Sequence, residues 1–187
     1  KYPRLIAAGK ISEKSKIAFV DDGSKDRTWA LIEELHESDP VFTGVKLSRN
    51  RGHQNALLGG LLTVAEDADV TISMDADLQD DIEAIDAMID KYRDGTDIVY
   101  GVRNDRKKDS FFKKSTAQGF YKLLRRMGVE SVYNHADFRL MSKRAVQGLA
   151  EFKEVNLFLR GMVPMVGYSH DFVYYERGER FAGESKY

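Results

Sequence analysis

The chain has 187 residues, of which 42% are hydrophobic and 32% are charged, and its net charge is −1. This balance is ordinary for one globular domain, so it excludes a low-complexity chain, and without a basic excess or a binding motif it argues against a nucleic-acid partner. The chain has no cysteine and no run of roughly 18 apolar residues, which excludes disulfides, zinc–thiolate sites and a spanning helix in these residues and predicts a soluble chain.

Strand-like and helix-like segments alternate through the first hundred residues. Short apolar runs predict strands at residues 16–20, 42–47, 70–74 and 97–101. Apolar side chains at helical spacing predict helices between them, at about residues 24–38, 52–66 and 81–92. This alternation predicts an α/β fold, with a mostly parallel sheet, helices on both of its faces and right-handed crossovers.

After residue 101 the pattern changes and predicts a shorter, mixed second half. The expected elements are a basic helix at 110–127, a loop at 133–136, a strand at 138–141, a helix at 142–150 and a strand at 168–175. The basic helix interleaves aromatic and cationic side chains. That pattern is as typical of a helix on an anionic membrane surface as of an amphipathic helix packed on the core.

Acidic side chains follow two of the predicted strands at the point where each strand ends. Asp75, Asp77 and Gln79 follow the third strand, where alternate residues share a face, and their oxygens suit Mg²⁺ or Mn²⁺. Asp21 and Asp22 follow the first strand. Carboxyl ends of parallel strands meet at one edge of a sheet, so these residues predict a crevice for a metal ion and a charged ligand.

Other acidic motifs fit less well. A calcium-binding EF-hand loop starting at Asp75 would need glycine at its sixth position and usually glutamate at its twelfth, where Asp80 and Asp86 stand. A phosphatase with an aspartate nucleophile would carry its acidic pair on the first strand, so it remains a poor alternative. His53 and His135 stand within two further motifs, residues 47–56 and 134–140, so a ligand contact is open to both, although a metal role is not favoured.

The segments that carry these residues resemble a known family. They are residues 20–28 (VDDGSKDRT), 47–56 (LSRNRGHQNA), 75–80 (DADLQD), 134–140 (NHADFRL), 157–161 (LFLRG) and 177–187 (RGERFAGESKY). Together they resemble the family 2 glycosyltransferases of the GT-A fold, and within that family the polyprenyl-phosphate glycosyltransferases similar to dolichyl-phosphate mannose synthase.

The resemblance implies a single GT-A catalytic domain, with a nucleotide-sugar-binding half at residues 1–102 and an acceptor-binding half at 103–187. The residues implied to bind the nucleotide sugar are Asp21, Asp22, Arg49, Gly52, Asp75, Ala76 and Asp77. The implied ligands of Mg²⁺ or Mn²⁺ are Asp75, Asp77 and Gln79, and the implied catalytic residues are Asp137 and Asp77. Arg139, Arg160, Arg177 and Arg180 would contact the acceptor or its phosphate.

The implied reaction is a metal-dependent, inverting transfer of a hexose from a UDP-sugar to a polyprenyl (undecaprenyl) phosphate at the cytoplasmic face of the plasma membrane. Whether Asp137 acts as a base or orients the acceptor is left open, and so is a homo-oligomer. Family members begin with a further strand and continue into membrane helices, so we expect both segments to be absent from these residues. A non-catalytic nucleotide-sugar-binding domain is the alternative.

Overall fold

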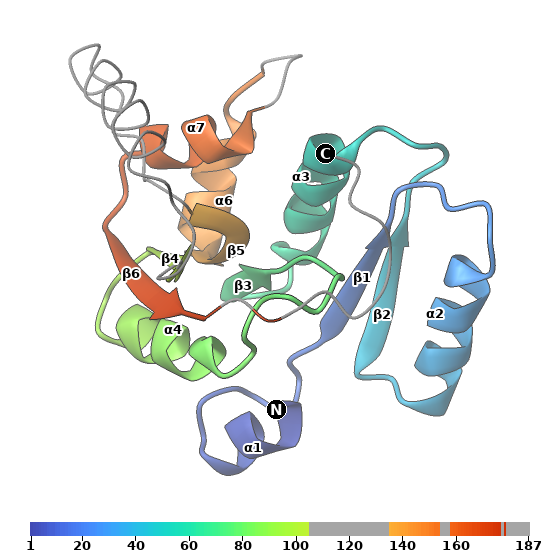
Figure 1. Ribbon diagram of the computed structural model, residues 1–187, viewed down its shortest axis with the longest axis horizontal. Coiled ribbons are helices and arrows are strands. Elements are labelled where there is room, and N and C mark those ends of the chain that lie inside the picture. Colours follow the sequence, from blue (N-terminus) through green and yellow to red (C-terminus); the bar gives the residue numbers. More distant parts are fainter. Residues whose placement is uncertain (105–134, 154–157, 177, 179–187) are drawn as a thin grey trace.

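A computed structural model describes residues 1–104, 135–153, 158–176 and 178 of the chain (Figure 1). The helix predicted at residues 110–127 lies outside these ranges, as do Arg177 and Arg180. None of the helices in the described ranges has the length and hydropathy that a membrane-spanning segment needs.

Helices and strands alternate through the first half, as the sequence predicts. The elements there are α1 (Tyr2–Ala7), β1 (Ile17–Asp21), α2 (Thr28–Ser38), β2 (Phe42–Lys46), α3 (His53–Val64), β3 (Val70–Ser73), α4 (Ala84–Arg93) and β4 (Ile98–Arg103). The second half contains β5 (His135–Ser142), α6 (Lys143–Ala150), α7 (Leu159–Met165) and β6 (His170–Tyr175). Among the elements of the second half, α7 is the one that the sequence pattern did not predict.

The strands form a parallel pair, β1–β2, and a four-stranded sheet in the order β3-β5-β4-β6. In the larger sheet β4 and β6 are parallel, whereas β5 runs antiparallel to both β3 and β4. The α/β class is therefore confirmed, and the mixed character of the second half enters the sheet through β5. This strand takes the central place because Phe138, Leu140 and Met141 are fully buried there and cover both faces.

Helices pack on both faces of the four-stranded sheet (Figure 1). Alternate residues of β4 point to opposite faces, so Ile98 and Tyr100 join the core formed with α3, α6 and α7. Val99 joins the second core, formed with α1 and α4. Because both cores hold the central strands in place, polar side chains on β5 have fixed positions.

Candidate active site

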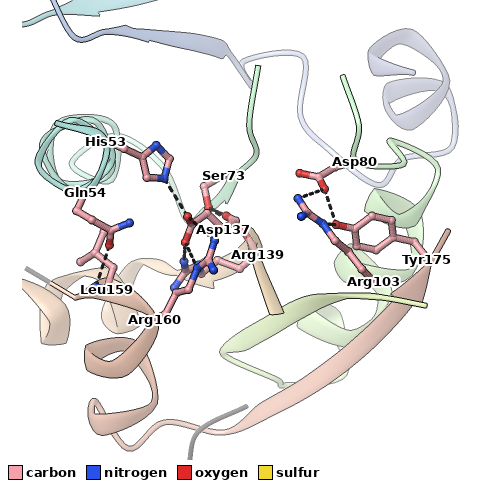
Figure 2. A network of polar contacts seen from close by, with 10 residues as sticks. All are labelled: His53, Gln54, Ser73, Asp80, Arg103, Asp137, Arg139, Leu159, Arg160 and Tyr175. Atoms are coloured by element: carbon pink, nitrogen blue, oxygen red, sulfur yellow. Dashed lines mark hydrogen bonds and ion pairs between the residues drawn. The ribbon is translucent and has the colours of Figure 1, made fainter. Parts of the chain in front are cut away.

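The polar residues of β5 lie at the centre of the site (Figure 2). The register pairs Arg139 with Ser73 of β3 on one side and with Tyr100 of β4 on the other. The Ser73 hydroxyl donates a hydrogen bond of 2.6 Å to the backbone oxygen of Asp137. This bond holds the backbone at Asp137 against the end of β3, directly before the acidic segment that begins at Asp75.

The Asp137 carboxylate is buried and bonded to three cationic or ionisable side chains. His53 Nε2 lies 2.9 Å from its Oδ2, Arg139 Nη2 donates to its Oδ1, and Arg160 Nη2 lies 3.3 Å from its Oδ2 (Figure 2). Burial acts to raise the pKa of Asp137, but the His53 hydrogen bond and the charges of Arg139 and Arg160 outweigh it and hold that pKa well below its ordinary value. Asp137 is therefore ionised at any physiological pH.

Asp75 lies in the opposite electrostatic environment. Burial raises its pKa, and the negative charges of Asp137, Asp80 and Asp77 raise it further, although His53 acts against them. The hydrogen bond to Asp137 raises the pKa of His53. Negative charge at Asp75 is thus incompletely compensated by the protein itself.

Within the described ranges, one group of side chains could hold a metal ion. Ligand atoms of His53, Asp75 and Asp137 lie within 4.8 Å of one another. Carboxylate oxygens of this kind suit Mg²⁺ and Mn²⁺, and the uncompensated charge at Asp75 fits a divalent cation. Of the three ligands predicted from the sequence, Asp75 is a member of this group, and His53 was not favoured as a ligand. The sequence signal that could have identified His53 is its position at the start of α3, directly after Gly52.

Asp77 and Gln79, the other predicted ligands, lie in the same loop as Asp75 but have different surroundings. Asp77 is half-buried, and its Oδ1 accepts a hydrogen bond of 3.1 Å from the backbone N–H of Gln79. Gln79 is buried, and its backbone oxygen accepts one of 2.9 Å from Gly178. Between them Leu78 is 63% exposed with φ 58°, a left-handed conformation that costs a leucine energy and marks a constrained loop.

The predicted nucleotide-binding residues of the first half form a second group. Both oxygens of Asp22 are engaged, since Oδ1 accepts from the Arg51 amide at 2.6 Å and Oδ2 from the Gly52 amide at 2.9 Å. Asp21 is buried at the end of β1, and within the described residues its Oδ2 has no hydrogen-bond partner. Ala76 and Arg49 are exposed.

Gly23 makes the approach of these two loops possible. Its φ is +73°, and an added Cβ would lie 2.6 Å from backbone atoms of Arg49 and Asn50. The backbone of residues 49–52 therefore lies directly against the loop after β1. Gly52 is bonded to Asp22 and is followed at once by His53, so the two groups of site residues are joined through adjacent positions of one chain segment.

The predicted phosphate-binding arginines differ in exposure. The Arg139 side chain is 1% exposed, and within the described part of the chain its Nε and Nη1 have no hydrogen-bond partner. The Arg160 side chain is 46% exposed and can reach a ligand while contacting Asp137. Arg139 therefore acts as the buried counter-charge of Asp137, and Arg160 is the arginine of the pair that faces solvent.

Sequence reasoning did not identify Gln54 as part of the site. Its Oε1 accepts a hydrogen bond of 3.0 Å from the Leu159 amide at the start of α7 (Figure 2). Arg160 is the next residue, so Gln54 and His53, neighbours on α3, hold Arg160 and Asp137 respectively.

The chain is similar to glycosyltransferases of known sequence and structure. The pattern of the family described as glycosyl transferase family 2 matches residues 5–149. An uncharacterized glycosyltransferase of Bacillus subtilis, YkoT, is 55% identical over 98% of this chain and 54% of its own length. The bactoprenol glucosyl transferase of Shigella phage SfV is 42% identical over 92% of the chain and 56% of its own length. The chain thus spans little more than half of these relatives.

A solved structure shows the same fold. It is the mannosyltransferase PcManGT from Pyrobaculum calidifontis in complex with GDP-Man and Mn²⁺, with a TM-score of 0.57 and 17% identity over 92% of this chain and 50% of that one. This likeness confirms the GT-A fold that the motifs implied. With the family pattern matched over most of its length, the chain belongs to glycosyl transferase family 2.

Proposed function

We propose that this chain is the catalytic domain of a metal-dependent, inverting glycosyltransferase that moves a hexose from a UDP-sugar to a polyprenyl phosphate at the cytoplasmic face of the membrane. The observation that carries the proposal is the pair of carboxylates at the site. Asp137 is held ionised by cationic side chains, and Asp75 is incompletely compensated. One carboxylate is thus suited to organise anionic groups through arginine, and the other to hold a cation.

The low pKa of Asp137 bears on the acceptor. A general base works best when its pKa lies near the working pH, so Asp137 is a weak base for a sugar hydroxyl. A phosphate monoester has a second pKa of about 6 and is already largely ionised near neutrality, so it needs little help from a base. The site therefore favours a phosphate acceptor, with Asp137 as an orienting group. The names of the bactoprenol glucosyl transferases support a polyprenyl chain on that phosphate.

The remaining residues supply binding and charge stabilisation. Asp75, Asp77 and Gln79, with His53 alongside, would hold Mg²⁺ or Mn²⁺, which when bound stabilises the charge of a diphosphate leaving group. Arg160 faces solvent and could contact a phosphate oxygen while paired with Asp137. Asp21, Asp22, Arg49 and Gly52 are proposed to bind the nucleotide. Arg177 and Arg180 are proposed as further phosphate ligands.

The test is a donor and acceptor screen on the full-length protein in detergent. We expect transfer from a UDP-hexose to undecaprenyl phosphate with Mn²⁺ or Mg²⁺, loss of transfer with EDTA, and an inverted anomeric configuration in the product. Asp77→Asn should lower the rate by about 100-fold or more, because it weakens stabilisation of the leaving group by several kcal/mol. Asp81→Asn, an exposed acid in the same segment, should not.

The outcomes separate the alternatives. A retained configuration would exclude direct displacement by the acceptor. Binding of a UDP-sugar with no turnover on any lipid phosphate would instead support a non-catalytic nucleotide-sugar-binding domain.

A further inference from the structure

Three polar side chains meet at the end of the acidic loop of residues 75–80, whose last residue supplies one of them. Arg103 Nη2 donates to Asp80 Oδ1 at 3.1 Å, Arg103 Nε donates to the Tyr175 hydroxyl at 3.2 Å, and that hydroxyl donates to the same Asp80 oxygen (Figure 2). The Asp80 side chain is fully buried, and that of Arg103 is 17% exposed. We call Asp80, Arg103 and Tyr175 the loop clamp.

The clamp joins elements that are distant in sequence. Asp80 ends the acidic loop, Arg103 ends β4 and Tyr175 ends β6. Two backbone hydrogen bonds reinforce it. The Gly178 N–H donates to the backbone oxygen of Gln79 at 2.9 Å, and the Asn104 N–H donates to the backbone oxygen of Tyr175 at 2.8 Å. The end of β6 and the residue Gly178 after it are thus hydrogen-bonded to two successive loop residues, Gln79 and Asp80.

The Tyr175 ring and its hydroxyl have separate roles. The ring packs edge-on against Phe138 of β5, with centroids 5.3 Å apart, and is part of the core around α4. Burial and the neighbouring Asp80 raise the pKa of the Tyr175 phenol, so the hydroxyl keeps its proton and donates a hydrogen bond to Asp80. Removing the hydroxyl alone therefore leaves the ring packing in place and removes the Tyr175 hydrogen bond to Asp80, while the Arg103 and Gly178 bonds to the loop remain.

The acidic loop has two reasons to move if it is not held. Asp75, Asp77 and Asp80 stand in one short loop, where carboxylates of like charge repel one another. Leu78 is in the left-handed conformation, which persists only where surrounding structure imposes it. Arg103 compensates the charge of Asp80, and the hydrogen bonds from Arg103 and Tyr175 fix the position of the Asp80 side chain.

We propose that Asp80, Arg103 and Tyr175 are positioning residues that hold the acidic loop in the conformation that binds the divalent cation and the donor diphosphate. Asp80 then differs in role from Asp75 and Asp77, although the three acids stand in one motif. It faces the protein and anchors the loop. This inference rests on the proposed function for its ligands, whereas the clamp itself rests on the contacts.

The test uses Tyr175→Phe in the full-length protein, with Tyr174→Phe as the matched control. Tyr174 is the neighbouring residue on β6 and is 68% exposed. Titration with Mn²⁺ alone, followed by the signal of the free ion in electron paramagnetic resonance, should show about tenfold weaker binding for Tyr175→Phe, because a hydrogen bond to a charged group is lost. Tyr174→Phe should bind Mn²⁺ as the wild type does.

Kinetics give a second measurement. The KM for the donor should rise in Tyr175→Phe, while kcat at saturating Mn²⁺ and donor changes by less than about threefold, because the reacting groups are intact. Asp80→Asn keeps an oxygen acceptor but loses the charge and should also weaken Mn²⁺ binding. Unchanged Mn²⁺ affinity in both folded variants would overturn the clamp. If the wild type transfers no sugar, the proposed function fails, yet the Mn²⁺ titration still decides the inference.

Discussion

Two carboxylates near His53 have pKa values that are shifted in opposite directions. Asp137 is bonded to His53, Arg139 and Arg160, so its pKa is lowered. Asp75 is partly buried among other acids, so its pKa is raised. Such a separation divides roles between groups of one chemical type. In this site Asp137 is a permanent anion that positions cationic groups, and Asp75 is an anion that a bound cation would stabilise.

The raised pKa of Asp75 predicts an exchange between function and stability. An acid whose pKa is higher in the folded state than in the unfolded state costs stability once it ionises. Asp75→Asn should therefore abolish metal-dependent transfer and yet melt about 2 °C higher than the wild type in EDTA at pH 7 to 8. The difference should shrink as the pH falls through the folded pKa and vanish below about 4, the ordinary carboxyl pKa, because Asp75 is then protonated in both states. Thermal unfolding between about pH 3 and pH 8 measures it.

Two comparisons check this prediction. Asp67→Asn removes an exposed acid before β3 and should leave the melting temperature unchanged. Added Mn²⁺ should raise the melting temperature of the wild type and not that of Asp75→Asn. A variant that is less stable than the wild type in EDTA would show that Asp75 is not under electrostatic strain.

At the scale of single residues, motifs supplied candidate site residues but not the residues that position them. Asp75 and Asp137 stand in recognisable segments, and the contacts bring them together with His53. The partners of Asp80 are 23 and 95 positions away, and no local pattern marks Arg103 or Tyr175 as its counterparts. Residues that position a loop depend on the tertiary structure, and a single sequence does not record which distant side chains face each other.

Among the elements, α3 has the largest influence on the site. His53 and Gln54 are its first two residues, and they contact Asp137 and the Leu159 amide. The N-cap residue of α7 is Phe158, whose side chain makes no capping hydrogen bond. Gln54 of α3 therefore caps the first turn of α7 from another helix. The direction of Arg160 from α7 is therefore set by α3.

This arrangement predicts a specific pattern for Gln54. Gln54→Ala should raise the KM for the lipid phosphate by about fivefold to tenfold, because losing a cap costs roughly 1 kcal/mol and loosens Arg160. Gln54→Glu keeps an acceptor at a helix N-terminus and should restore most of the affinity. Steady-state kinetics with varied acceptor measure both variants.

The control for Gln54 is Gln147→Ala, which removes an exposed glutamine from α6 and should leave the KM unchanged. Equal losses of affinity in Gln54→Ala and Gln54→Glu would mean that the site needs the side-chain NH₂ of Gln54 and not its acceptor oxygen.

Sequence patterns also predicted elements better than their pairing. The helix expected at 142–150 is found as α6, where the Ser142 hydroxyl accepts a hydrogen bond from the Ala145 amide as an N-cap should. The strand expected at 138–141 is found as the longer β5. Its central antiparallel place was not predicted, because period and composition report burial and do not identify the neighbouring strand. The helix α7 escaped prediction because it is only 7 residues long and contains Pro164.

In the whole molecule, the site draws on both sheets. The larger sheet holds the two apolar cores and supplies Asp75 and Asp137 at strand ends or within strands. The β1–β2 pair supplies Asp21 and Asp22, and it contacts the rest through α3, where a Cβ on Gly60 would lie 2.4 Å from Val20 Cγ2. A donor that occupies the proposed nucleotide and metal sites would touch loops from both sheets.

Hydrogen exchange can therefore separate the two parts of the donor site. Mn²⁺ alone should slow exchange in residues 75–80, whereas Mn²⁺ with UDP should also slow it in residues 21–24 and 49–53, because a ligand that binds only the closed form suppresses local opening. The Asp22 bonds to the Arg51 and Gly52 amides make these last positions sensitive reporters. Asp75→Asn should lose the effect of Mn²⁺ at 75–80 and weaken that of UDP at 21–24. Protection by UDP confined to residues 75–80 would contradict the nucleotide role of Asp21 and Asp22, since the ligand would then contact the larger sheet alone.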